Sequence, residues 1–95
     1  MSAPEIGPET TLRRADRAVH GELPEETVLL DVEDKVAVRL NQTGAWLWER
    51  LEQPETVAEL AVGLASEFGI DGERALADVE AFASDLAGRS LLDTA

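Results

Sequence analysis

The sequence predicts a single α+β domain in which a three-stranded antiparallel sheet is followed by three helices. Two patterns support this fold class. Before residue 41, apolar and polar residues alternate over short segments, which is the period of half-buried strands. After residue 43, apolar residues recur every three or four positions, as they do along one face of a helix. A chain of 95 residues is long enough for one domain with a thin core and too short for two.

Three short segments are predicted to be strands. The first, residues 17–23, alternates weakly, whereas residues 27–32 carry apolar side chains at every second position. A tight reversal at Glu33-Asp34 leads into residues 35–40, which alternate in the same way. Short reversals place successive strands side by side and antiparallel. We therefore expect a meander whose last strand, residues 35–40, has a free edge.

The last strand runs almost directly into the first helix, which is predicted over residues 43–52 and ends ahead of Pro54. Asn41, or alternatively Thr43, can cap this helix by accepting a hydrogen bond from a free N–H of its first turn. Helical spacing places one group of side chains toward the core, namely Gly44, Leu47, Trp48 and Leu51. Trp46 points away from that group, so we expect it to be partly exposed.

The second and third helices carry start and stop signals. Thr56 and Glu59 form a capping box, and Gly69 suits the left-handed geometry that ends a helix. Asp71 is predicted to cap the third helix, which is loosened at Gly88. The predicted core stripe of this helix is Ala75, Val79, Phe82 and Leu86, and an apolar flank beside it is Leu76, Ala83 and Ala87. Three strands followed by three helices make an arrangement of winged-helix type.

The ends of the chain and its composition bear on location. Residues 1–10 contain two Pro, one Gly and no apolar period, and we expect them to form a flexible arm ahead of a domain spanning residues 11–95. The chain has no Cys, no apolar run long enough to cross a bilayer, and no N-terminus of the kind that directs secretion. These features predict a cytoplasmic protein without disulfides that does not enter a membrane.

The balance of charge limits the partners. Twenty Asp and Glu against eight Lys and Arg give a formal net charge of −12, which repels phosphate backbones and anionic lipid. Acidic helix surfaces also serve simply to keep small domains in solution. We therefore expect no binding to nucleic acid or membranes. The partner is expected to be a protein, a peptide or a cation. The protein itself is predicted to be a monomer.

Catalytic and metal-binding residue sets are missing from the sequence. His20 is the only His, and without Cys the chain has no soft-metal site and no second partner for a nucleophile. Asp78 and Asp85 share one side of the third helix, where they could chelate a hard cation or form a solvated face. The seven glycines match no phosphate loop or dinucleotide fingerprint. The sequence thus predicts a protein that is not an enzyme and needs no cofactor or metal.

A binding surface is the remaining functional feature. If residues 35–40 form the edge of the sheet, their unpaired N–H and C=O groups and the apolar flank of the third helix could together form a groove. An extended peptide could then add to the sheet as a fourth strand, with alternate side chains reaching the groove. The alternative is that Leu76 and the alanines of the flank simply pack on a neighbouring helix.

Several short motifs resemble those of the PqqD-like family over residues 17–93. They are Leu40-Asn41-Gln42-Thr43-Gly44-Ala45 with Trp48, then Asp78-Val79 with Phe82 and Leu86, and a closing Leu91-Leu92. Members of this family, also called RiPP recognition elements, are small winged-helix adaptors that bind the leader segment of a ribosomally made precursor peptide. The resemblance implies that the leader contacts Val36, Ala37, Val38, Arg39, Leu40, Arg74, Ala75, Leu76, Asp78, Val79 and Phe82.

One departure from the family pattern indicates a particular pathway. The hairpin reads Leu30-Asp31-Val32-Glu33-Asp34-Lys35, where proteins of pyrroloquinoline quinone synthesis carry an aromatic residue and a Pro-Glu-Gly phrase. The sequence looks more like the free-standing elements of lasso-peptide biosynthesis. In those systems the resemblance implies two enzyme partners, a cysteine protease that removes the leader and an ATP-dependent cyclase that forms the macrolactam.

Three other functions remain open from the sequence. A chaperone of pyrroloquinoline quinone biosynthesis would fit the same family. A winged-helix transcription regulator would fit the fold order, but residues 71–88 contain only Arg74 against five acidic residues, which disfavours DNA binding. A structural subunit of a larger enzyme would purify together with that enzyme.

Overall fold

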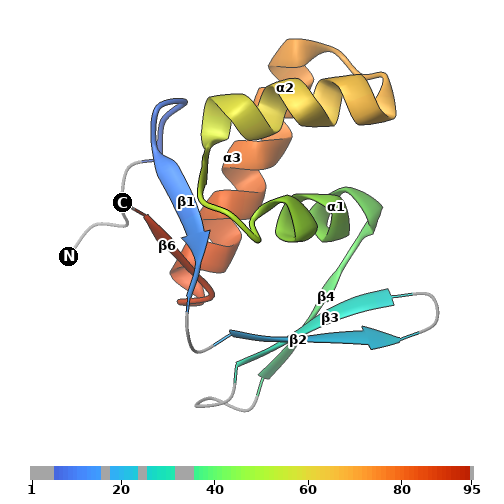
Figure 1. Cartoon of the computed structure of the whole chain (residues 1–95), viewed down its shortest axis with the longest axis vertical. Helices are drawn as coiled ribbons and strands as arrows, with labels where there is room; N and C mark the ends of the chain where they lie inside the picture. The colour runs from blue at the N-terminus through green and yellow to red at the C-terminus, as the bar shows by residue number, and fades with distance from the viewer. Residues whose placement is uncertain (1–5, 16–17, 24–25, 32–35, 95) are drawn as a thin grey trace.

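The computed structural model describes the backbone of residues 6–15, 18–23, 26–31 and 36–94, and the side chains of residues 6–15 and 38–94. Within these ranges the chain is an α+β domain with two small sheets and three helices. Strands β1 and β6 lie beside helix α3, whereas strands β2, β3 and β4 extend below helix α1 (Figure 1).

The predicted three-stranded antiparallel sheet is confirmed. It contains β2 (Ala18–Leu23), β3 (Glu26–Asp31) and β4 (Val36–Leu40), in the order β2-β3-β4. Leu40 stands opposite Thr27, and Val36 stands opposite Asp31. The predicted reversal at Glu33-Asp34 lies outside the described residues. Because β4 is last in the order β2-β3-β4, it is an edge strand among the described residues, as the meander predicts.

A second sheet was not predicted from the sequence. It contains β1 (Thr11–Arg14), β5 (Glu55–Thr56) and β6 (Leu92–Thr94), in the antiparallel order β5-β1-β6. The pairing of β1 with β6 brings the two ends of the domain together, and Leu12 and Leu92 both enter the core. Strand β1 therefore holds together the start of α2, which follows β5, and the end of α3, which precedes β6.

The three helices begin where their capping residues predict. Helix α1 (Gln42–Arg50) is capped by Asn41, whose side-chain oxygen accepts a hydrogen bond from Gly44 N–H at 2.8 Å. Helix α2 (Val57–Phe68) opens on the capping box of Thr56, and helix α3 (Gly72–Gly88) is capped by Asp71. Asn41, rather than the alternative Thr43, therefore caps the first helix.

The backbone carbonyls of residues 8 and 10 accept hydrogen bonds from the first turn of α2. The first four N–H groups of a helix have no partner inside it. Here the N–H of Thr56 donates to Glu59 and that of Glu59 donates to the Thr56 hydroxyl. The N–H of Val57 donates to the Thr10 carbonyl at 3.0 Å, and that of Ala58 donates to the Pro8 carbonyl at 2.8 Å. Part of the stretch expected as an N-terminal arm thus hydrogen-bonds to a helix.

The core lies where the three helices meet β1 and β6. Its completely buried members include Leu12, Trp48, Leu60, Leu64, Val79, Leu86 and Leu91. The predicted core face of α1 is confirmed, since Gly44, Leu47, Trp48 and Leu51 are all buried. On α3 the stripe differs by one residue from the prediction, because Ala83 is completely buried while Phe82 is only partly buried.

The residues that follow α2 and α3 both adopt left-handed backbone geometry, but only one of them is a glycine. Gly69 follows α2 with φ 63°, and Ser90 follows α3 with φ 61°. Left-handed geometry costs a residue with a Cβ about 1 kcal/mol. Ser90→Gly is therefore expected to raise the free energy of unfolding by about 0.5–1 kcal/mol, measured by urea denaturation. The reverse change, Gly69→Ser, serves as the matched variant and should lower it, and equal effects of the same sign would contradict this account.

The capping box makes the stability of α2 depend on pH. The backbone N–H and then the hydroxyl of Thr56 donate to the Glu59 carboxylate, and they hold the pKa of Glu59 below its ordinary value of 4.5. A lowered pKa contributes stability above that value, and the contribution is lost as the pH falls through the folded-state pKa. Glu59→Gln is therefore expected to be less stable than the wild type at pH 7, with the difference shrinking below about pH 4.5. Urea denaturation of the wild type and Glu59→Gln between pH 7 and about pH 4 measures this difference in stability. Glu67→Gln, on the exposed side of α2, is the control.

Candidate functional site

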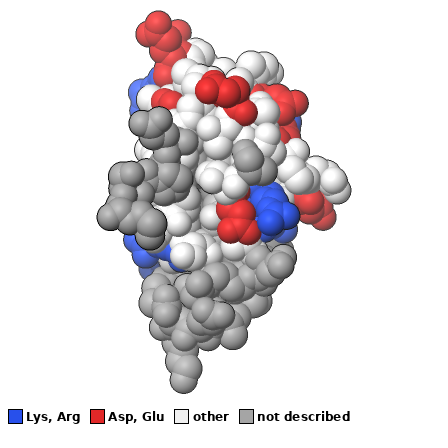
Figure 2. Space-filling model, turned by 90° about the vertical axis from the view of Figure 1, so that its left-hand side faces the viewer, with Lys and Arg blue, Asp and Glu red and all other residues white. Residues whose placement is uncertain are grey.

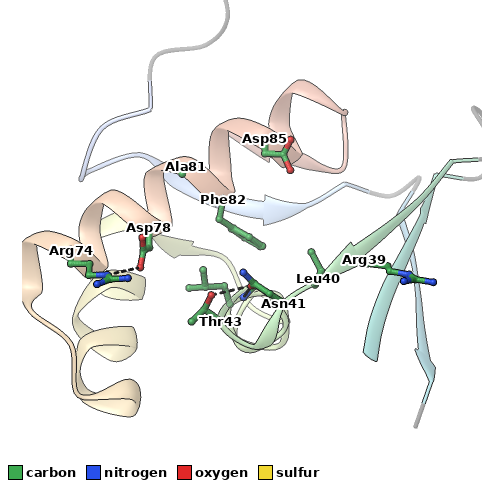
Figure 3. Close-up of a pocket in the computed structure, with 11 residues that line it drawn as sticks. Arg39, Leu40, Asn41, Thr43, Arg74, Asp78, Ala81, Phe82 and Asp85 are labelled. Atoms are coloured by element: carbon green, nitrogen blue, oxygen red, sulfur yellow. Dashed lines mark hydrogen bonds and ion pairs between the residues drawn. The ribbon is translucent and has the colours of Figure 1, made fainter. Parts of the chain in front are cut away.

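A groove of about 570 Å³ lies between the end of β4, the start of α1 and helix α3. We call it the β4–α3 groove. It is lined by Arg39, Leu40, Asn41, Thr43, Gly44, Leu47, Arg74, Asp78, Ala81, Phe82 and Asp85. Figure 3 shows the side chain of Phe82 reaching from α3 toward Leu40, across the space that the two elements enclose. The groove therefore joins a sheet edge to a helix face.

The strand-to-helix junction determines the shape of one wall. Asn41 caps α1 and also accepts a hydrogen bond from the Thr43 hydroxyl at 3.0 Å. A Cβ atom at Gly44 would stand 3.1 Å from the Asn41 oxygen and 3.5 Å from the Leu40 Cβ. The absence of a side chain at Gly44 thus lets the cap close tightly against the helix, next to Leu40, which lines the groove.

The groove has apolar walls and charges of both signs. Leu40, Leu47, Ala81 and Phe82 supply apolar surface. Two Arg and two Asp also line it, and the Arg74 guanidinium lies 4.0 Å from the Asp78 carboxylate. Asp85 instead pairs with Arg89 at 3.1 Å. Exposed pairs of this kind contribute little to stability, so a charged ligand could replace one partner of the Arg74–Asp78 or Asp85–Arg89 pair at little cost to the fold.

The backbone edge of β4 opens beside the groove. Within the described residues, β4 pairs with β3 along one edge from Val36 to Leu40, and no strand pairs with its other edge. An unpaired edge presents N–H and C=O groups to any extended chain that lies alongside it. The groove and the edge together can receive a peptide backbone and every second one of its side chains.

Only part of the predicted contact set lines the groove. Arg39, Leu40, Arg74, Asp78 and Phe82 do so. Val38 is partly buried against the core, and Val36 and Ala37 lie in β4, where their side chains are outside the described residues. The sequence did not single out Ala81 or Asp85 as contacts, although both share the face of α3 that carries Asp78.

Three predicted contacts on α3 do not line the groove. Ala75 and Val79 are completely buried, so they support the core and offer no surface to a peptide. Leu76 lines a different hollow, together with residues of α2. The predicted apolar flank is therefore not the wall of the groove, because its member Ala83 is also completely buried. Packing against neighbouring elements, the alternative reading of that flank, describes Ala83 correctly.

The described residues show neither a metal-binding cluster nor a membrane-spanning helix. No group of three or more His, Cys, Asp or Glu that could hold a metal ion occurs among the described residues. No helix in those residues is long and apolar enough to cross a membrane. Trp46 is partly buried, with its ring edge-to-face to Phe68 and 5.0 Å from the Arg50 guanidinium, in agreement with the predicted partial exposure.

Comparison with known proteins relates this geometry to a family. No curated protein sequence matches the chain. The structure of TbiB1 in complex with the TbiA(beta) leader peptide is 25% identical, with a TM-score of 0.78 over 85% of this chain and 94% of that one. A lasso peptide synthetase B1 complexed with the leader peptide is 24% identical and shares the fold, with a TM-score of 0.78 over 86% of this chain and 96% of the other. Residues 26–92 match the family described as coenzyme PQQ synthesis protein D. Because this match spans more than half of the chain, the protein belongs to the PqqD family.

Proposed function

We propose that this protein is a non-catalytic adaptor that binds the leader segment of a ribosomally made precursor peptide. The observation that carries the proposal is the β4–α3 groove, which opens beside the edge of β4 that no strand of the described residues pairs with. The similar TbiB1 structure contains a leader peptide, which supports the same use of the fold. The leader would add to β4 as an extended strand, and alternate side chains would contact Leu40, Ala81 and Phe82.

The wider role follows from this binding. A protein that holds the leader leaves the rest of the precursor free for modifying enzymes. We therefore propose a place in lasso-peptide biosynthesis, with a leader-removing cysteine protease and an ATP-dependent cyclase as the enzymes served. The second candidate, a chaperone of pyrroloquinoline quinone biosynthesis, is favoured by the description of the matching family.

Titration of fluorescently labelled leader peptides tests both candidates. We expect saturable anisotropy with the leader of the precursor encoded beside this protein, at least tenfold tighter than with a scrambled peptide of the same composition. A pyrroloquinoline quinone precursor peptide should bind no better than the scrambled one. Tighter binding of that precursor would support the second candidate, and no saturable binding of either peptide would refute the adaptor role.

A transcription regulator is disfavoured by the structure of α3. The helix carries Arg74 at its exposed surface, whereas Glu73 and Asp85 are exposed acidic residues on the same helix. A DNA-reading helix needs a basic surface. A mobility shift of duplex DNA at moderate salt would revive this function, and we expect none.

A further inference from the structure

Helix α1 forms one wall of the β4–α3 groove and packs against α2 with another side. Its groove-lining residues are Thr43, Gly44 and Leu47. Trp46, which lines no part of the groove, contacts α2 through its ring, which lies edge-to-face to Phe68. Gly63, in the middle of α2, lies beside the same ring. A helix of nine residues shifts as one body, so a contact that displaces Trp46 also displaces the wall of the groove.

Gly63 lets α1 and α2 approach each other closely. A Cβ atom at this position would stand 2.9 Å from Cη2 of Trp46 and 2.7 Å from Nη1 of Arg50, whereas ordinary van der Waals contact begins at 3.4 Å. A glycine inside a helix lowers the stability of that helix relative to alanine. The close approach of the two α1 side chains is therefore the physical reason for a glycine in the middle of α2.

The Trp46 ring is bounded by neighbours on several sides. Its centroid lies 6.2 Å from that of the Phe68 ring, and the Arg50 guanidinium lies 5.0 Å from it. Two hydrogen bonds to the Glu55 carboxylate, at 3.1 and 2.7 Å, hold that guanidinium in place. Arg50 is exposed and can swing into solvent, but the half-buried ring cannot. A Cβ atom at Gly63 would therefore push on the ring and, through it, on α1.

We propose that Gly63 and Trp46 are positioning residues for leader binding, because their contact sets the distance between α1 and α3 and thus the width of the β4–α3 groove. The inference rests on the proposed adaptor function and adds a determinant of affinity that the leader does not touch. After a Cβ is added at Gly63, a retreat of about half an ångström restores ordinary contact with the ring. That retreat moves Leu47 relative to Phe82. A groove that is already formed costs less to occupy than one that must rearrange.

Substitutions that test this contact should leave the charge of the protein unchanged. Figure 2 shows separate patches of acidic atoms on the helical part of the molecule, and the net charge is −12. A change at Arg50 would alter the attraction for any charged leader as well as the packing. Gly63→Ala and Trp46→Phe change only the size of side chains that lie outside the groove.

Anisotropy titrations of the labelled leader with the wild type, the two single variants and the double variant test the proposal. Gly63→Ala should weaken leader binding by about fivefold or more. In the Trp46→Phe background the same change should weaken it by less than about twofold, because Phe lacks the Cη2 atom that the added methyl group would meet. Gly88→Ala is the matched control, since a Cβ at Gly88 meets no atom within 4 Å. It should bind the leader like the wild type.

Folding and the position of α1 are measured in the same proteins. Alanine favours a helix, so Gly63→Ala should stay folded, and urea denaturation checks that unfolding does not cause the loss of binding. The backbone amide NMR signals of Thr43 and Leu47 in the free protein should shift in Gly63→Ala but not when the same change is made in the Trp46→Phe background.

Three results would overturn the positioning role while leaving the adaptor function standing. They are wild-type affinity of Gly63→Ala, an equal loss of affinity from this change in both backgrounds, and amide signals of α1 that do not shift. A wild type that binds no leader would instead refute the adaptor function, and the positioning role with it.

Discussion

Ala81→Trp is expected to weaken leader binding at least tenfold, which corresponds to about 1.4 kcal/mol, without unfolding the protein. Ala81 is exposed and lines the β4–α3 groove from the α3 side. An indole at this position would occupy space between α3 and Leu40, where the side chains of an added strand are proposed to lie. Because the change is at the surface of a helix, it should cost the fold only the small difference in helix propensity between Ala and Trp.

Ala77→Trp separates a blocked groove from a general effect of the new side chain. Ala77 is one turn earlier on the same helix, is also exposed, and does not line the groove. Anisotropy titrations should give wild-type affinity for this variant, and thermal melts should agree for the two variants. If both variants bind the leader like the wild type, the peptide does not occupy this groove. If both lose binding equally, the loss arises from the helix as a whole.

The strand side of the site could be predicted because its signals are local. Arg39 and Leu40 directly precede Asn41, whose side chain closes the first turn of α1 at 2.8 Å. A cap of this kind fixes where the strand ends and the helix begins, and it needs only neighbouring residues. The same holds for Thr56 with Glu59 at the start of α2.

The helix side was harder to predict because the sequence period shows that one half of α3 is apolar. It does not show which residues of that half face the core. Apolar residues occupy adjacent positions along α3, so a stripe through Phe82 and one through Ala83 fit the sequence almost equally well. Packing against the rest of the core selects Ala83, which is completely buried. That selection turns Phe82 and Ala81 toward the groove and Leu76 away from it.

The second sheet could not be predicted because its pairing is long-range and its strands are very short. Strand β5 has two residues and β6 has three, which is too few for an alternating pattern to be recognised. Leu12 pairs with Thr94 at the far end of the chain, and no local signal connects them. Tertiary contacts, rather than propensity, therefore define β1 and β6.

Trp48→Ala is expected to have the largest effect on stability, a loss of about 3–5 kcal/mol. Trp48 is 1% exposed and is among the largest side chains of the core. Its ring also lies 4.7 Å from the Arg14 guanidinium, which donates hydrogen bonds to the Trp48 carbonyl. The free energy of unfolding of a folded domain is about 5–15 kcal/mol, so the variant should be partly unfolded at 37 °C. Urea denaturation followed by circular dichroism measures the change.

Trp48→Phe tells whether the indole is held by packing alone or also by a polar contact. Within the described part of the chain, the Trp48 Nε1 is buried and has no hydrogen-bond partner. Phe therefore removes ring volume without leaving an acceptor unpaired, and the loss should be about 1–2 kcal/mol, well below that of Trp48→Ala. Since Arg14 can stack on either ring, its hydrogen bond to the residue 48 carbonyl should persist. Equal losses for Phe and Ala would mean that the Nε1 donates to a partner, and that packing alone does not hold the indole in the core.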